Sequence, residues 1–178
     1  MTETRAENQS VRALPRALPL TSMIAQEAIL DGKVDVIELT RLAGALANTE
    51  GSVSVHLEFS KDDEKRRCVK GELTAQVNVF CQRCLSPMPL EVTQAFCLAV
   101  VADEEAGKQL PETLDPVFVV DDELDVFDLT EEEVLLALPI VSKHPHECGM
   151  REYFVSEQSE DEPRQNPFEN LADMLDKK

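Results

Sequence analysis

The sequence predicts an α+β fold in which a mostly antiparallel sheet is bordered by a few short helices. Three stretches between residues 53 and 100 alternate apolar and polar side chains, which is the period of a half-buried strand. The stretches with a helical pattern are short and lie on either side of this region. Strands in the centre and helices at the edges favour α+β, with a barrel-like closure of the sheet as the alternative.

The strands are predicted from the positions of the apolar residues. The first run, 53–59, and the second, 73–81, are separated by a polar turn at 61–66, which predicts an antiparallel hairpin. A third run occupies 90–100, and the short all-apolar segment 117–120 is expected to be a fourth strand. The sheet is therefore expected to contain at least these four strands.

Two helices are expected within the central region. Thr40 can cap a segment that ends near Asn48 and carries its leucines on one face. Thr130 and Glu133 have the spacing of a capping box, which predicts that a second helix starts there. Pro139 limits the length of this second helix, because proline lacks the backbone N–H that a helix interior uses.

The ends of the chain differ from its middle in composition. Residues 1–19 and 155–165 are polar or interrupted by proline, which predicts a flexible N-terminal segment and an acidic linker. The 178 residues suit one domain, and we place a single α+β core at 20–154. The termini are therefore expected to flank one packed centre.

A short amphipathic helix is predicted at 166–178. Asn166 can cap it, and Phe168 and Leu171 fall on the same side. This apolar side either covers the chain's own core or recognises a partner protein. We therefore treat Asn166, Phe168 and Leu171 as interaction residues.

The charge balance excludes several classes of partner. The chain carries 35 Asp and Glu against 17 Lys and Arg, a formal net charge of -18, and this field repels DNA, generic RNA surfaces and anionic lipid. The longest apolar run, 134–141, is too short for a bilayer span, and no secretory segment precedes the core. We expect a cytoplasmic protein that contacts neither membrane nor DNA.

The cysteines carry the clearest chemical signal. Cys81 and Cys84 have the spacing that lets two sulfurs face one metal ion, and His146 and Cys148 could complete a tetrahedral zinc site. Two other interpretations stay open: inert, unmetallated thiols that fill space, or a redox dithiol. One structural zinc is therefore the cofactor hypothesis, with no cofactor as its alternative.

No pattern of catalysis accompanies these cysteines. Nothing near them indicates the third group that would orient a cysteine–histidine pair. The six glycines are isolated and form neither a phosphate-binding loop nor a nucleophile elbow. We expect a protein that is not an enzyme.

A small basic cluster contrasts with the acidic whole. Lys65, Arg66, Arg67 and Lys70 lie at the predicted hairpin turn, and Arg83 could join them in space and contact phosphate. The alternative is a solvated turn that prevents edge-to-edge association of sheets. No aromatic stacking platform accompanies the cluster, which favours the solvated turn.

Several short motifs together resemble a known family. They are residues 80–85, 124–129, 133–139, Cys148, and 166–168 followed by Leu171. In this order the motifs are similar to those of the bacterial YceD-like family, named for large ribosomal RNA subunit accumulation. The resemblance implies a non-enzymatic factor in ribosome biogenesis that supports accumulation of 23S-type rRNA. Some relatives carry more cysteines after the Leu-Pro motif than this chain does.

The charge of the chain bears on how such a factor would act. A strongly acidic protein opposes phosphate, so we expect action through a basic ribosomal protein or through ribosome assembly intermediates. Direct contact with rRNA, through Arg83 and the basic cluster, stays open. The alternative function is a small zinc-binding or CxxC dithiol protein whose cysteines carry the activity.

Overall fold

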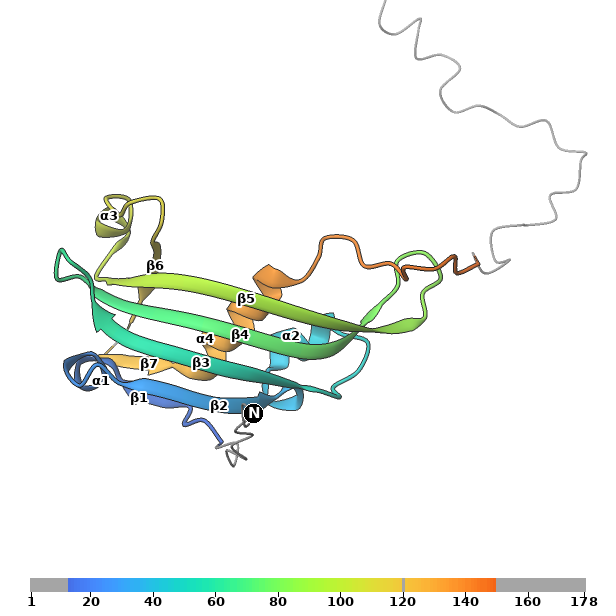
Figure 1. The fold of residues 1–178 in the computed structure, drawn as a ribbon, viewed down its shortest axis with the longest axis horizontal. Coiled ribbons are helices and arrows are strands. Elements are labelled where there is room, and N and C mark those ends of the chain that lie inside the picture. The colour runs from blue at the N-terminus through green and yellow to red at the C-terminus, as the bar shows by residue number, and fades with distance from the viewer. Residues whose placement is uncertain (1–12, 120, 150–178) are drawn as a thin grey trace, which may run out of the picture. The chain divides into compact units, whose positions relative to one another are not determined.

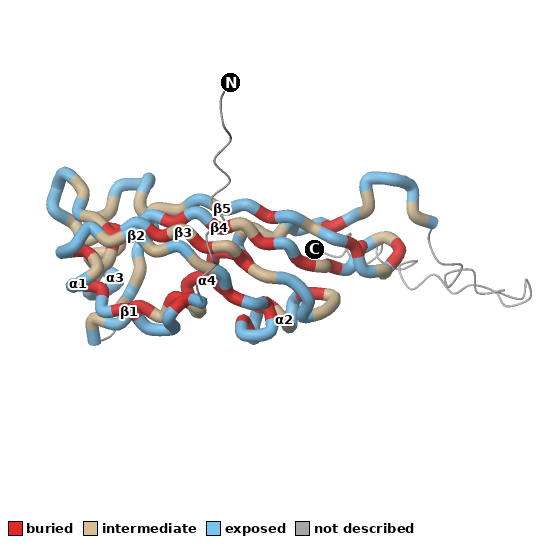
Figure 2. The backbone as a smooth tube through the Cα atoms, turned by 60° about the horizontal axis from the view of Figure 1, so that its bottom comes forward, coloured by how far each residue is buried: buried red, intermediate tan, exposed pale blue. Residues whose placement is uncertain are grey.

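The computed structural model describes residues 13–119 and 121–149, which form an open five-stranded sheet with short helices on one face (Figures 1 and 2). The elements in chain order are β1 Ala17–Pro19, α1 Leu20–Ala25, β2 Ile29–Asp35, the 3-10 helix η1 Val36–Glu38, α2 Thr40–Ala45, β3 Ser52–Lys61, β4 Arg67–Phe80, β5 Pro87–Val101, α3 Glu104–Gly107, β6 Asp115–Phe118, β7 Glu123–Asp125 and α4 Val126–Ala137. The predicted α+β class is confirmed.

The sheet has the order β2-β3-β4-β5-β6 and is antiparallel from β2 through β5. β6 pairs with the end of β5 in parallel, and β2 and β6 are the two edges, so the barrel-like alternative is wrong. The expected hairpin is present, with Val55 opposite Leu73. The fourth strand lies at 115–118, slightly earlier than the expected 117–120.

One face of the sheet forms the core. Along β3 and β4 every second side chain is buried, and these residues pack under α1, α2 and α4 (Figure 2). Gly71 is required in this layer because the ring of Phe96, its partner on β5, occupies the space of a Cβ: the nearest ring atom lies 2.0 Å from the ideal Cβ position. The alternate residues face the other side of the sheet and are mostly polar.

Helix α4 begins earlier than the sequence predicted. The carboxylate of Asp125 accepts hydrogen bonds from the backbone N–H of Phe127 and Asp128, both at 2.9 Å, and so caps the helix. Thr130 is buried one turn inside α4, so its expected capping role is wrong. Because Asp125 satisfies the free N–H groups, the helix gains a turn at its start.

Glu131 of α4 positions α2 across the core. Its carboxylate accepts hydrogen bonds from the backbone N–H of Leu42 at 2.8 Å and from Nε of Arg41 at 2.9 Å. Burial raises the pKa of Glu131, but these donors outweigh burial and hold the pKa below its ordinary value. The paired carboxylate therefore stays ionised and joins two helices that are 89 residues apart in sequence.

The core starts before residue 20. Leu14 and Leu18 are buried, and β1 pairs with β7, so the expected flexible segment 1–19 does not extend through residues 14–19. The second edge strand, β2, was not anticipated. The expected linker 155–165 and helix 166–178, with Asn166, Phe168 and Leu171, lie outside the described residues.

Candidate metal centre

The Cys81–Ser86 turn connects β4 to β5. The backbone N–H of Cys81 donates to the carbonyl of Ser86 at 2.9 Å, and the N–H of Leu85 donates to the carbonyl of Cys81 at 2.8 Å. Leu85 has a φ of 59°, in the left-handed region that lets the chain reverse direction tightly. This turn presents both cysteines of the CxxC motif on the same side as the segment that follows α4.

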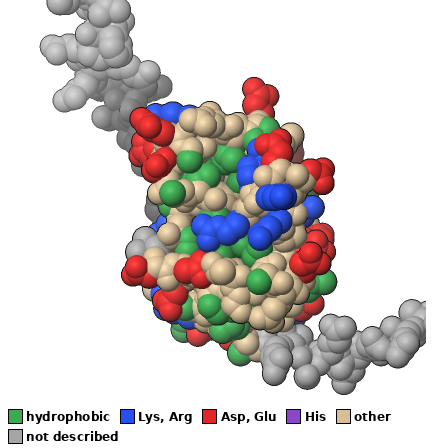
Figure 3. All heavy atoms as spheres, turned by 90° about the vertical axis from the view of Figure 1, so that its left-hand side faces the viewer, with side chains coloured by type: hydrophobic (Ala, Val, Ile, Leu, Met, Phe, Trp, Pro, Cys, Tyr) green, Lys and Arg blue, Asp and Glu red, His purple; other side chains and the backbone are tan. Residues whose placement is uncertain are grey.

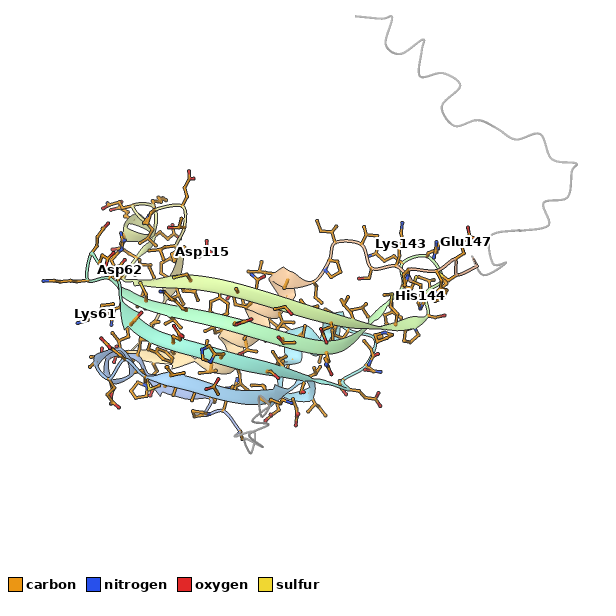
Figure 4. The ribbon with its side chains drawn as sticks, viewed as in Figure 1. Lys61, Asp62, Asp115, Lys143, His144 and Glu147 are labelled. Atoms are coloured by element: carbon orange, nitrogen blue, oxygen red, sulfur yellow. The ribbon has the colours of Figure 1, made fainter. Side chains whose placement is uncertain are left out.

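The segment 138–148 reaches the same turn from far along the chain. After α4 ends, the carbonyl of Ser142 accepts a hydrogen bond from the N–H of Gln82 at 2.8 Å, and the carbonyl of Ile140 accepts one from Nε2 of Gln82 at 3.1 Å. Figure 4 shows Lys143, His144 and Glu147 at this end of the sheet. Through its backbone N–H and its side-chain amide, Gln82 therefore holds the segment that carries His144 and Cys148 against the turn that carries Cys81 and Cys84.

Four potential ligand atoms converge there. Sγ of Cys81, Cys84 and Cys148 and a ring nitrogen of His144 all lie within 4.8 Å of one another. The Sγ atoms of Cys81 and Cys148 are 3.6 Å apart, and Sγ of Cys84 is 3.4 Å from Nδ1 of His144. Tetrahedral zinc with Zn–S bonds of about 2.3 Å needs sulfurs about 3.8 Å apart. We call these four residues the Cys₃His cluster; they could hold a metal such as zinc.

The histidine of the cluster differs from the one expected. His144, not His146, contributes the ring nitrogen, while the ring of His146 lies 5.0 Å from that of His144, centroid to centroid. The carbonyls of both histidines accept hydrogen bonds from Arg83, so this backbone contact does not by itself select one imidazole. Spacing from Cys148 alone gave no means of choosing between the two histidines.

Arg83 encloses the cluster from the CxxC turn. Its Nε donates to Sγ of Cys148 at 3.0 Å, and its guanidinium also donates to the carbonyls of His144, at 3.3 Å, and His146. One side chain therefore fixes the 144–148 segment at three points. The charge of Arg83 and its hydrogen bond to Sγ also act to lower the pKa of Cys148.

The environment of Cys81 stabilises its thiolate. Burial raises the pKa of the Cys81 thiol, but the backbone N–H groups of Cys84, His144 and Arg83, together with the thiol of Cys148, lower the pKa to about 5. Burial raises the pKa of Cys148, against the effect of Arg83. Three cysteines and one imidazole, partly enclosed by protein, form the closed donor set of a structural zinc site.

The basic cluster lies at the other end of the sheet from the metal centre, so the expected participation of Arg83 in it is wrong. Lys61 and Asp62 mark this end in Figure 4, and Figure 3 shows Lys and Arg side chains gathered there among carboxylates. Arg66 pairs with Asp62 at 2.6 Å and Glu64 at 2.8 Å, and Arg67 pairs with Asp122 at 3.3 Å. Arg66 therefore stabilises the turn itself, and Arg67 joins the start of β4 to the segment before β7.

The length and polarity of a helix decide whether it could cross a membrane. In the part of the chain that the structure describes, no helix is both long and apolar enough to span a bilayer.

Comparison with known proteins identifies relatives across most of the chain. The family model described as large ribosomal RNA subunit accumulation protein YceD matches residues 69–175. A protein of Haemophilus influenzae with that name is 31% identical over 145 residues, which cover 79% of this chain and 83% of the relative. No solved structure matches. The matched region begins in β4 and includes all four residues of the Cys₃His cluster.

Proposed function

Because the chain belongs to the YceD family of large ribosomal RNA subunit accumulation proteins, we propose that it is a non-catalytic ribosome biogenesis factor that acts through protein contacts. The family match carries this proposal, since it spans nearly all of β4, the whole of β5 and the Cys₃His cluster. In this role the protein supports the accumulation of 23S-type rRNA. Its partners are ribosome assembly intermediates or a basic ribosomal protein.

Charge supports an indirect route to the rRNA. The formal net charge of -18 opposes approach to a phosphate backbone and favours a cationic protein surface. The local basic residues do not offset this, because Arg66 and Arg67 are already paired with Asp62, Glu64 and Asp122. The protein would therefore reach the large subunit through a basic protein.

The Cys₃His cluster has a structural role in this proposal. Cys81, Cys84, His144 and Cys148 would hold one zinc ion, which supplies folding energy by linking two distant segments. Arg83 and Gln82 orient the segment 140–148 for this purpose through the hydrogen bonds described above. The ion would make the end of the sheet one rigid surface.

Deletion of the gene tests the function. We expect less mature large-subunit rRNA relative to small-subunit rRNA, together with precursor particles on sucrose gradients, and restoration of both by the wild-type gene. A normal subunit ratio in the deletion strain would exclude the ribosomal function.

A second candidate is favoured by the cluster itself: a small zinc or dithiol protein whose cysteines carry the activity. Metal analysis and thiol titration of the purified protein separate the two. If a Cys84→Ser variant still restores rRNA accumulation, the cysteines are dispensable for that role. The second candidate function must then be tested by a measurement other than rRNA accumulation.

A further inference from the structure

The outer face of the sheet carries the carboxylates that a cationic partner could meet. Among the residues that alternate with the core, its polar members include Asp31, Lys33, Ser54, His56, Glu58, Lys70, Glu72, Thr74, Gln76, Asn78, Glu91 and Thr93. In this set the acidic residues outnumber the lysines. The face is mostly polar, with Ile29, Ala95 and Cys97 as apolar members at the end away from the metal centre.

A hollow lies on this face near the end that carries the metal centre. It has a volume of about 380 Å³ and is lined by Glu50, Gly51, Gln76, Val77, Asn78, Pro89, Leu90 and Glu91. The register places Gln76 opposite Glu91 and Asn78 opposite Pro89, so the lining follows neighbouring rungs of the sheet. Two carboxylates and two amides therefore surround one depression, which we call the Glu50–Glu91 hollow.

The polar groups of the hollow are held in place. Nε2 of Gln76 donates to Glu91 at 3.2 Å, and Nδ2 of Asn78 donates to Oδ1 of Asn48 at 3.3 Å. Oδ1 of Asn48 also accepts from the N–H of Glu50 at 3.1 Å. These hydrogen bonds restrict the residues of the hollow before a ligand binds, so less conformational entropy is lost on binding.

Gly51 sets the depth of the hollow. Its φ is 125°, and a Cβ at this position would lie 2.1 Å from the carbonyl oxygen of Gln76. The chain before β3 can therefore approach β4 closely only with glycine here. This approach brings Glu50 next to the amides of β4.

An aromatic ring extends the hollow toward the metal centre. Phe80 lies two residues beyond Asn78 on the same face of β4, opposite Pro87, and is 49% exposed. A guanidinium can pair with a carboxylate through its planar fork and also stack on an aromatic ring, whereas an ammonium is a compact, strongly hydrated charge. Phe80 is four residues along β4 from Gln76, the partner of Glu91, a span of about 13 Å. A segment with several arginines can therefore pair one guanidinium with the carboxylates and stack another on the ring, which lysines cannot do as well.

We propose that the Glu50–Glu91 hollow docks an arginine-rich segment of a partner protein, with Phe80 against a guanidinium. The inference rests on the proposed function, because it names the chemistry of the basic partner. Carboxylates exclude RNA from the hollow by repulsion. The Cys₃His cluster contributes by fixing the turn that follows Phe80.

Peptide binding to the full-length, zinc-loaded protein tests the proposal, with labelled nona-arginine and nona-lysine as probes in fluorescence anisotropy. The paired variants are Glu50→Gln with Glu91→Gln in the hollow, and Glu104→Gln with Glu105→Gln on α3 as a control with the same change in charge. We expect the hollow variant to weaken nona-arginine binding about tenfold and the control less than about twofold. Equal losses in both variants would show attraction by net charge alone and overturn the site.

Phe80→Leu tests the choice of arginine. This variant keeps an apolar side chain and removes the aromatic ring, so we expect it to weaken nona-arginine binding more than nona-lysine binding. Equal effects on both peptides would overturn the stacking. Melting temperatures of all variants show whether each one folds.

Complementation of the deletion strain separates failure of the hollow from failure of the function. A hollow variant that no longer binds nona-arginine and also fails to restore large-subunit rRNA supports the proposal. A hollow variant that loses peptide binding and restores the rRNA fully would overturn the docking site, while the proposed function stands. A deletion strain with a normal subunit ratio would instead remove the function, whatever the peptides do.

Discussion

The two ends of β4 are closed in opposite ways. At one end, Asp62 alone organises the turn between β3 and β4: its carboxylate accepts hydrogen bonds from the N–H groups of Glu64 and Arg66 at 2.9 and 2.8 Å, and from Nε of Arg66 at 2.6 Å. At the other end, the Cys81–Ser86 turn is joined to a segment 58 to 67 residues away in sequence. The first closure is local and the second is long-range.

The turn at the Asp62 end is therefore stabilised by contacts within the hairpin, whereas the turn at the cysteine end is stabilised by contacts with the segment that completes the metal centre. Closing a long loop costs more chain entropy than closing a short one, so the contacts at the cysteine end must offset a larger loss. The four residues of the Cys₃His cluster, drawn from both segments, would supply such contacts by holding one metal ion. The cysteine end should therefore depend on zinc, and the Asp62 end should not.

The largest effect is expected for Cys84→Ser. Loss of one ligand should release the zinc and remove its contribution to stability, which is about 4 kcal/mol when free zinc is a thousandfold above its Kd. Zinc content by mass spectrometry and urea unfolding of the purified protein measure both. Cys97→Ser is the matched control, because Cys97 lies on β5 outside the cluster. Wild-type protein that carries no zinc as purified and is no more stable than the variant would contradict the site.

Arg83→Met should have the next largest effect. It leaves the four ligands in place but removes the donor to Cys148 and to two carbonyls of the 144–148 segment. Loss of a group that orients a ligand typically weakens metal binding by about 10- to 100-fold, which competition with a chelator measures. Lys143→Met is the control with the same change in charge on an exposed neighbour. Equal affinities in both variants would show that Arg83 does not act on the cluster.

The same contrast explains what the sequence could predict. Strands β3, β4 and β5 follow from the alternation of apolar and polar residues, which is regular in β3 and most of β4 and less regular in β5. β2 was missed because its residues, Ile29–Asp35, lie at an edge and only Val34 is fully buried, so no clear alternation marks it. Elements with a clear local pattern could be predicted from the sequence, whereas elements placed by contacts between distant residues could not.

The metal ligands show this limit at the level of single residues. Two cysteines three positions apart predict one half of a site, but the choice of His144 over His146 depends on which ring the folded segment places beside Cys84. The start of α4 has the same origin: Asp125 and Thr130 both have an acidic residue three positions later, and β7, which pairs with β1, ends at Asp125. A sequence pattern alone could not rank these alternatives.

Asp62→Ala should weaken the opposite turn by less and independently of zinc. Burial raises the pKa of Asp62, but the side chain and N–H of Arg66 and the N–H of Glu64 lower it below 3.8. A carboxylate with a lowered pKa stabilises the fold above its ordinary pKa, and this stability is lost as the pH falls through the lowered value. The stability difference between wild type and variant should therefore be constant near neutral pH and shrink below about pH 3.8.

Urea unfolding of both proteins, at pH 7 with zinc and with a chelator and then in chelator down to pH 3, measures this difference. Asp63→Ala is the control, because Asp63 is an exposed residue of the same turn. A variant whose deficit depends on zinc would show that the two ends of β4 are coupled.

The smallest effects concern two residues with left-handed backbone, Lys65 in the first turn and Leu85 in the second, with φ values of 64° and 59°. A non-glycine residue in this conformation costs about 1 kcal/mol of folding free energy. Glycine removes this cost but loses more conformational entropy on folding, so only part of it is gained as stability. Lys65→Gly should raise stability by a fraction of this amount in zinc-loaded and zinc-free protein alike, because that turn forms without metal. Leu85→Gly should favour the zinc-loaded form, because metal ligation fixes the turn around Leu85 while the zinc-free chain can relax there. We therefore expect Leu85→Gly, and not Lys65→Gly, to raise zinc affinity, by at most about fivefold if the full 1 kcal/mol is gained. Chelator competition measures the zinc affinity of the two variants. An equal rise in zinc affinity in both would mean that the turn at Lys65 depends on metal as much as the turn at Leu85 does.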